Sequence, residues 1–120
     1  MIYTSYFAKI RKFPEGLIPI SICAFIPKFY DGIEYKKLAP TKDILLKYKE
    51  DLNEEEYDAS FSKEVLSLLD PKVVENELLT LANGKTPVLC CYEKSSDFCH
   101  RKLVSKWLNE AGIECAEIDL

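Results

Sequence analysis

Two short apolar runs set the tightest limit on the fold of this chain. Residues 17–25 (LIPISICAF) and 87–92 (PVLCCY) carry apolar side chains at nearly every position rather than at every second one. Such continuous runs are typical of strands that are covered on both faces, as in parallel sheets. Parallel strands are usually joined by helices, so the two runs predict an α/β fold.

Helix start signals lie between and after these runs. Thr41 and Asn53 are N-cap residue types, each followed by a helix-forming segment. Pro71 follows Asp70 and suits the first position of a third helix, which Gly84 ends. We expect helices over residues 42–49, 54–69, 71–83 and 97–111.

Two further segments complete the expected sheet. Residues 2–7 and 113–118 are rich in apolar and β-branched side chains, which indicates a first and a last strand. With 120 residues, the chain suits a single domain. We therefore predict one domain over residues 1–120, with a mainly parallel sheet of about four strands flanked by helices in a Rossmann-like, three-layer arrangement.

Charge and cysteine usage narrow the classes of function. The net charge is −4 and the isoelectric point is about 5.1, which argues against a broad nucleic-acid-binding surface. No apolar run approaches the ~18–20 residues of a membrane span, and the N-terminus lacks the layout of a signal peptide. The chain has five cysteines, an odd number, which we interpret as reduced thiols of a cytoplasmic protein.

The functional prediction rests on residues 90–101, CCYEKSSDFCHR. A buried strand ends there and is followed by a polar loop, and the next helix begins directly after this loop. Ligands of open α/β sheets bind outside the carboxyl ends of the strands, and a helix N-terminus offers free N–H groups to an anion. The site residues that we expect in this segment are Glu93, Lys94, Cys99, His100 and Arg101.

Three of these side chains are candidate catalytic groups. Cys99 lies at a helix start beside basic residues, an arrangement that lowers the pKa of a thiol and makes it a nucleophile. His100 and Glu93 are candidates for proton transfer. The alternatives are a buried Cys99 that only packs, a hydrogen-bonded structural His100 and a structural ion pair of Glu93.

The two cations of the segment are candidate ligand contacts. Arg101 at a helix start matches the geometry of phosphate or carboxylate, and Lys94 adds a second charge. The alternative is an internal ion pair with Glu93 or Asp97.

The cysteines do not predict a metal site. Cys90, Cys91, Cys99 and His100 offer sulfur and nitrogen, but their spacing is not a standard zinc pattern. Neighbouring strand residues also point to opposite faces, which separates Cys90 from Cys91. We expect no metal and no cofactor. A reversible redox pair of Cys91 and Cys99 stays open as an alternative.

The loop over residues 27–40 follows the second strand and should lie at the same edge of the sheet. Lys28 and Tyr35 are candidate ligand contacts, because lysine suits a phosphate and tyrosine suits a base. Tyr30 and Lys36 share this chemistry. The alternative is that the tyrosines pack against the sheet and the lysines are solvated.

The string from Cys90 to Arg101 resembles the hallmark of the DUF488 family, small α/β proteins of unassigned biochemical function. Upstream segments, among them 20–23 and 35–40, resemble further positions of that family. The resemblance implies the α/β fold and no particular reaction. Members commonly carry Arg near the position of Ala24, and some carry Asp near Ile22, so the chain departs from the family pattern there.

The function that we predict from these residues is binding of a phosphate-bearing small molecule or nucleotide at the site over residues 91–101, with catalysis open. The alternatives are a non-catalytic binding or interaction protein with a structural Cys/His/Arg network, and a thiol redox protein. We expect no membrane partner.

Overall fold

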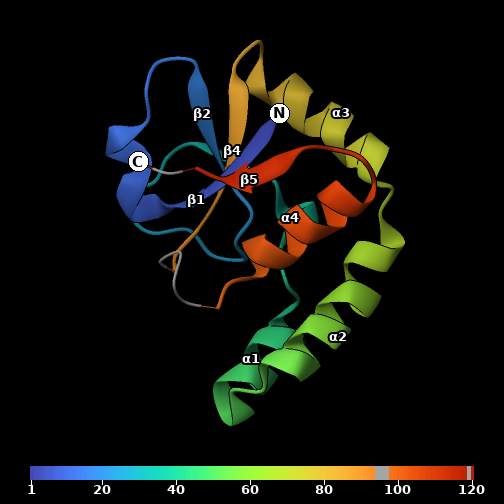
Figure 1. The fold of residues 1–120 in the computed structure, drawn as a ribbon. Helices are drawn as coiled ribbons and strands as arrows, with labels where there is room; N and C mark the ends of the chain where they lie inside the picture. The colour runs from blue at the N-terminus through green and yellow to red at the C-terminus, as the bar shows by residue number, and fades with distance from the viewer. Residues whose placement is uncertain (94–97, 119) are drawn as a thin grey trace.

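The computed structural model describes residues 1–93, 98–118 and 120. Within these residues, five parallel strands form one sheet in the order β3-β2-β4-β1-β5 (Figure 1). The strands are β1 Ile2–Tyr6, β2 Leu17–Ser21, β3 Ile33–Glu34, β4 Thr86–Cys91 and β5 Cys115–Glu117. The α/β class and the parallel sheet are confirmed, and the short β3 is an addition within a segment predicted to be a loop.

The central position of β4 explains its continuous apolar sequence. Val88 is paired with Tyr3 of β1 on one side and with Pro19 of β2 on the other. The residues from Val88 to Cys91 are fully buried. A strand with neighbours on both edges and cover on both faces has no position that favours a polar side chain.

The first three helices begin where their N-cap residues predict, whereas the last helix begins later than the expected residue 97. They are α1 Lys42–Asp51, α2 Glu54–Glu64, α3 Pro71–Ala82 and α4 His100–Glu110, with 3₁₀ turns at Phe7–Lys12, Lys36–Leu38 and Leu66–Leu68. The side chains of Thr41, Asn53 and Asp70 each accept a hydrogen bond from a backbone N–H of the first turn. The helix expected over residues 54–69 is shorter, because the chain leaves α-helical geometry at Val65.

The helices divide into a packed group and a projecting pair. α4 lies against β1, β4 and β5, while α3 contacts β4. α1 and α2 pack side by side and extend beyond the sheet, at the lower end of Figure 1. α2 also contacts α4, which places the pair beside the start of α4. Among the described residues, no helix combines the length and the apolar character that crossing a bilayer requires.

Candidate functional site

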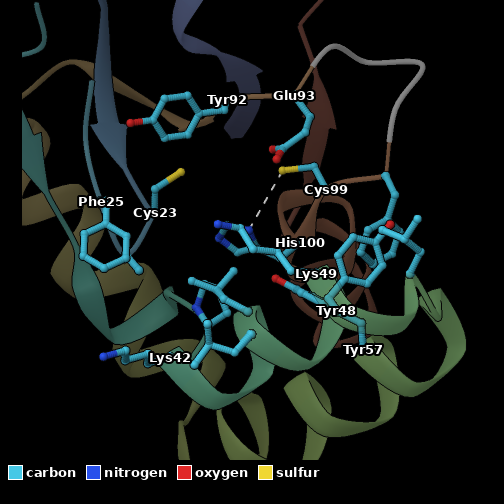
Figure 2. Close-up of a pocket in the computed structure, with 16 residues that line it drawn as sticks. Cys23, Phe25, Lys42, Tyr48, Lys49, Tyr57, Tyr92, Glu93, Cys99 and His100 are labelled. Atoms are coloured by element: carbon cyan, nitrogen blue, oxygen red, sulfur yellow. Dashed lines mark hydrogen bonds between the residues drawn. The ribbon is translucent and has the colours of Figure 1, made fainter. Parts of the chain in front are cut away.

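A pocket of about 450 Å³ opens at the carboxyl edge of the sheet (Figure 2). Its walls come from the segments that follow β2 and β4, from α1 and α2, and from the start of α4. The volume lies within the ~300–1,000 Å³ range of small-molecule sites, and the position is the one expected for a ligand of an open α/β sheet.

Aromatic rings form one wall of this pocket. Tyr48 of α1, Tyr57 of α2 and Phe98 before α4 have ring centroids 5.0–5.3 Å apart. Phe25 and Tyr92 line the pocket as well, and both are exposed. These rings come from four separate segments, so the wall exists only in the folded chain. It provides apolar and planar contact area for a ligand.

Cys99 lies at the base of the pocket, at the N-cap position of α4. Its backbone is extended there, with φ −152° and ψ 142°, and its carbonyl accepts the N–H of Lys102 at 3.1 Å. Only 3% of the residue is exposed, yet it lines the pocket. Figure 2 shows its sulfur between the Glu93 carboxyl group and the His100 ring.

The surroundings of Cys99 favour its thiolate. Burial opposes ionisation, but hydrogen bonds from Cys91 and His100 and the positive charge of the imidazole outweigh it. The backbone N–H of Arg101, in the first turn of α4, acts in the same direction. Together they lower the pKa of the Cys99 thiol well below its ordinary value.

His100 is held by a backbone carbonyl. Its Nε2 lies 2.7 Å from the carbonyl oxygen of Ile22, and since a carbonyl only accepts, Nε2 carries a proton. Nδ1 lies 3.7 Å from Cys91 Sγ and 3.9 Å from Cys99 Sγ. Burial lowers the pKa of His100, but the bond to Cys99 and the thiolate charge raise it, with a net increase. The pKa shifts of His100 and Cys99 both favour an imidazolium–thiolate pair.

Glu93 follows β4 and brings a carboxyl group to the same sulfur (Figure 2). The residue as a whole is exposed, but partial burial of the carboxyl group and then the negative charge of Cys99 raise its pKa. A carboxyl group whose pKa is raised beside a thiolate is suited to act as a general acid.

Two further thiols surround the His100 ring. Cys91 is fully buried, and burial raises its pKa, so that it remains a thiol. Cys23 lines the pocket, and a hydrogen bond from Cys91 lowers its pKa against the opposing effect of burial. Cys91 therefore donates to its sulfur neighbours. Nothing in the sequence spacing links Cys23, which follows β2, to the other two.

Cys91, Cys99 and His100 are also the described residues that could hold a metal ion. One donor atom from each lies within 4.8 Å of the others. Cys90 is not in this group, because alternation along β4 turns its side chain away from Cys91, as expected.

Arg101 lies in the interior and does not line the pocket, contrary to its predicted role as a ligand contact. Its Nε and Nη2 each donate to a carboxylate oxygen of Glu117 at 3.0 Å, and Nη1 donates to the Glu93 carbonyl at 2.7 Å. The geometry favours the internal ion pair that was the alternative. The partner is Glu117 of β5, which the sequence analysis did not consider.

The remaining predicted contacts do not meet at the pocket. Tyr35 is buried, and its hydroxyl donates to Glu77 of α3 at 2.5 Å. Lys28 is exposed, and neither residue lines the pocket. Lys94 lies outside the described residues.

Two lysines that the sequence analysis did not single out lie at the pocket. Lys42 and Lys49 of α1 line it, and among the described residues neither has an ion-pair partner. Their spacing of seven residues places them on one face of the helix, which was the available signal. Which face meets the pocket depends on tertiary packing.

A family model described as DUF488-N3a, "Active DUF488-N3 subclade", matches residues 10–112 of the chain. The match includes β2, β4, α1–α4 and every residue of the pocket named above. No curated protein and no solved structure matches the chain.

Proposed function

The chain belongs to the DUF488 family, and we propose that it is a cysteine-dependent enzyme whose nucleophile is Cys99. One observation carries the proposal: the Cys99 sulfur lies at the base of a ligand-sized pocket, between an imidazole and a carboxyl group. The word "active" in the description of the matching model favours catalysis over a purely structural network.

The roles follow from the positions of the three groups. The Cys99 thiolate attacks an electrophilic centre of the ligand and forms a bond to it, while the bond to the leaving group breaks. Glu93 gives its proton to the leaving group. The resulting carboxylate then takes a proton from a water molecule, whose oxygen bonds to the same centre of the ligand as the bond to the Cys99 sulfur breaks. The product leaves, and both the Cys99 thiolate and the protonated Glu93 are restored. His100 keeps the thiolate charged and fixed in position.

The pocket favours a ligand with a flat apolar part and an anionic part. The aromatic wall suits a base or another ring, and Lys42 and Lys49 suit a phosphate group. We therefore retain a phosphate-bearing small molecule or nucleotide as the ligand class, with these lysines in place of Arg101. The first turn of α4 already serves an anion of the protein, the Cys99 thiolate, so the lysines are the better phosphate contacts.

Thiol reactivity tests the catalytic proposal. Folded protein is treated with iodoacetamide at pH 7, and each cysteine is followed by mass spectrometry against glutathione as a reference thiol. We expect Cys99 to react first and faster than glutathione, while buried Cys115 stays unmodified. If Cys99 reacts no faster than glutathione, a non-catalytic binding or interaction protein is the better description.

Thermal stability tests the ligand class, since a ligand that binds the folded state raises the melting temperature. Wild type and the double variant Lys42→Ala/Lys49→Ala are compared with adenosine, AMP and inorganic phosphate. We expect AMP to stabilise wild type more than adenosine does, and the difference to vanish in the double variant. Lys28→Ala is the matched control, because Lys28 is exposed away from the pocket. Equal shifts with adenosine and AMP would remove phosphate from the proposal.

A further inference from the structure

The cluster behind Cys99 has the dimensions of a zinc site. Zinc bonds sulfur at ~2.3 Å and imidazole nitrogen at ~2.0–2.1 Å, so tetrahedral geometry separates these donors by about 3.6 Å. His100 Nδ1 lies 3.7 Å from Cys91 Sγ and 3.9 Å from Cys99 Sγ. The two nitrogen–sulfur distances are therefore within a few tenths of an ångström of the required separation, and all three donors lie within 4.8 Å of one another.

The histidine is oriented as a metal ligand would be. Metal-binding histidines usually donate the N–H of the other ring nitrogen to a carbonyl or carboxylate, which fixes the ring and its tautomer. Nε2 of His100 meets the Ile22 carbonyl at 2.7 Å, which leaves Nδ1 as the nitrogen free for a metal. Cys91 Sγ lies 3.7 Å from Nδ1 and 3.8 Å from Nε2, so metal binding requires the Cys91 side chain to shift toward Nδ1.

Charge and access also fit a divalent ion. Two thiolates and a neutral imidazole balance a charge of +2, which a buried site requires. Cys99 and His100 line the pocket, whereas Cys91 lies behind them and does not. An ion held by the three would have its fourth position toward the pocket, as in zinc sites that keep one position open.

We propose that Cys91, Cys99 and His100 form a zinc-binding site with three protein ligands and a fourth position that faces the pocket. A bound ion shares one electron pair of the Cys99 sulfur and withdraws charge from it. Zinc therefore lowers the nucleophilicity of Cys99, and we expect zinc to slow any reaction that uses this thiol. The residues involved come from β4 and the start of α4, so the site needs the folded sheet.

Cobalt titration of the reduced, metal-free protein tests this site, because thiolate–cobalt bonds absorb in the near ultraviolet. We expect an absorption band that saturates at one equivalent of Co²⁺ and disappears when Zn²⁺ is added. Cys91→Ala should weaken Co²⁺ binding at least tenfold. Cys90→Ala is the matched control, since Cys90 is the adjacent, equally buried cysteine of β4 with its side chain on the other face.

Absence of the band in wild type, or equal affinity in Cys91→Ala and wild type, would overturn the proposal. Circular dichroism checks that the variant is folded, and His100→Gln provides a second ligand deletion if it is not. The test is independent of the proposed enzyme. A cobalt band together with slow Cys99 alkylation supports the zinc site alone, and fast alkylation without a band supports the enzyme alone.

Discussion

His100 and Arg101 are neighbours in α4 but belong to two different polar clusters. One cluster lies at the pocket, and the other is closed within the protein. Both side chains are buried, and both leave the first turn of the helix. His100 turns toward the pocket and three thiols, whereas Arg101 turns toward β1 and β5. A rotation of about 100° between successive helical residues separates a site that meets a cavity from one that does not.

The Arg101 cluster is closed. The guanidinium is bidentate on Glu117, caps the Glu93 carbonyl and lies 5.6 Å from the centre of the Tyr6 ring. Thr4 donates to the same carboxylate at 2.6 Å. Such a network holds β1, β5 and the end of β4 together around the helix start.

The His100 cluster is built from weaker contacts. Its sulfur–nitrogen distances are 3.7–3.9 Å, and two of its members line a cavity. Loosely held groups of shifted pKa beside a pocket are typical of functional sites, whereas closed ion pairs are typical of structural ones. The comparison indicates that one cluster maintains the fold and that the other is available for chemistry.

Arg101→Ala gives the largest expected effect on stability. The substitution leaves Glu117 and the Glu93 carbonyl without their cation and opens a cavity. We expect a loss of about 3 kcal/mol in the free energy of unfolding, at the low end for a broken buried pair because the Glu117 side chain is 31% exposed. Urea denaturation measures it. Lys106→Ala, an exposed cation on the same helix, should change stability by less than about 0.5 kcal/mol.

Equal stabilities of Arg101→Ala and Lys106→Ala would contradict the conclusion that the Arg101 cluster maintains the fold. The Arg101 cluster would then contribute nothing that an exposed lysine does not.

His100→Gln tests whether the imidazole of the His100 cluster keeps the Cys99 thiolate charged. The pKa of Cys99 is lowered, so wild type retains its thiolate as the pH falls, and its alkylation rate should change little between pH 8 and pH 6. Without the imidazolium, the thiolate fraction falls with pH, and we expect at least tenfold slower alkylation at pH 6, equivalent to about 1.4 kcal/mol. Mass spectrometry of Cys99 over this pH range measures the rate.

Parallel pH profiles in wild type and His100→Gln would contradict the imidazolium–thiolate pair. Arg101→Lys is the matched control where it folds, since it alters the neighbouring residue and retains the charge.

Thr4→Val gives the smallest effect. Valine has the shape of threonine and removes one hydrogen bond to Glu117, while both bonds from Arg101 remain. We expect a loss of about 1 kcal/mol in the free energy of unfolding and an unchanged rate of Cys99 alkylation. Slower alkylation in this variant would show that the two clusters are coupled.

The fold was accessible from the sequence because its signals are local. Continuous apolar runs marked the buried strands, and Thr41, Asn53 and Asp70 marked the helix starts. The ends of β2 and α2 were placed too late, since apolar residues continue beyond the regular hydrogen bonding.

The site was accessible only in part. The motif placed Glu93, Cys99 and His100 in one segment, and the structure brings them to one pocket. We expected the last helix to begin near residue 97, but it begins at His100, and each residue of shift turns a side chain by about 100°. The prediction that Arg101 contacts a ligand depended on where α4 begins. The contributions of Lys42 and Lys49 depended on how α1 packs, which local patterns do not specify.

Because a backbone carbonyl, that of Ile22, holds the His100 ring, this part of the site does not depend on which side chain stands at position 22. Every amino acid carries this oxygen, so the residue at position 22 can change while the partner of the imidazole remains. The path of the backbone after β2, and not any side chain, therefore determines that Nε2 of His100 carries a proton. Sequence comparison would therefore find no side chain at position 22 that varies together with His100, even though removing this partner would require moving the backbone.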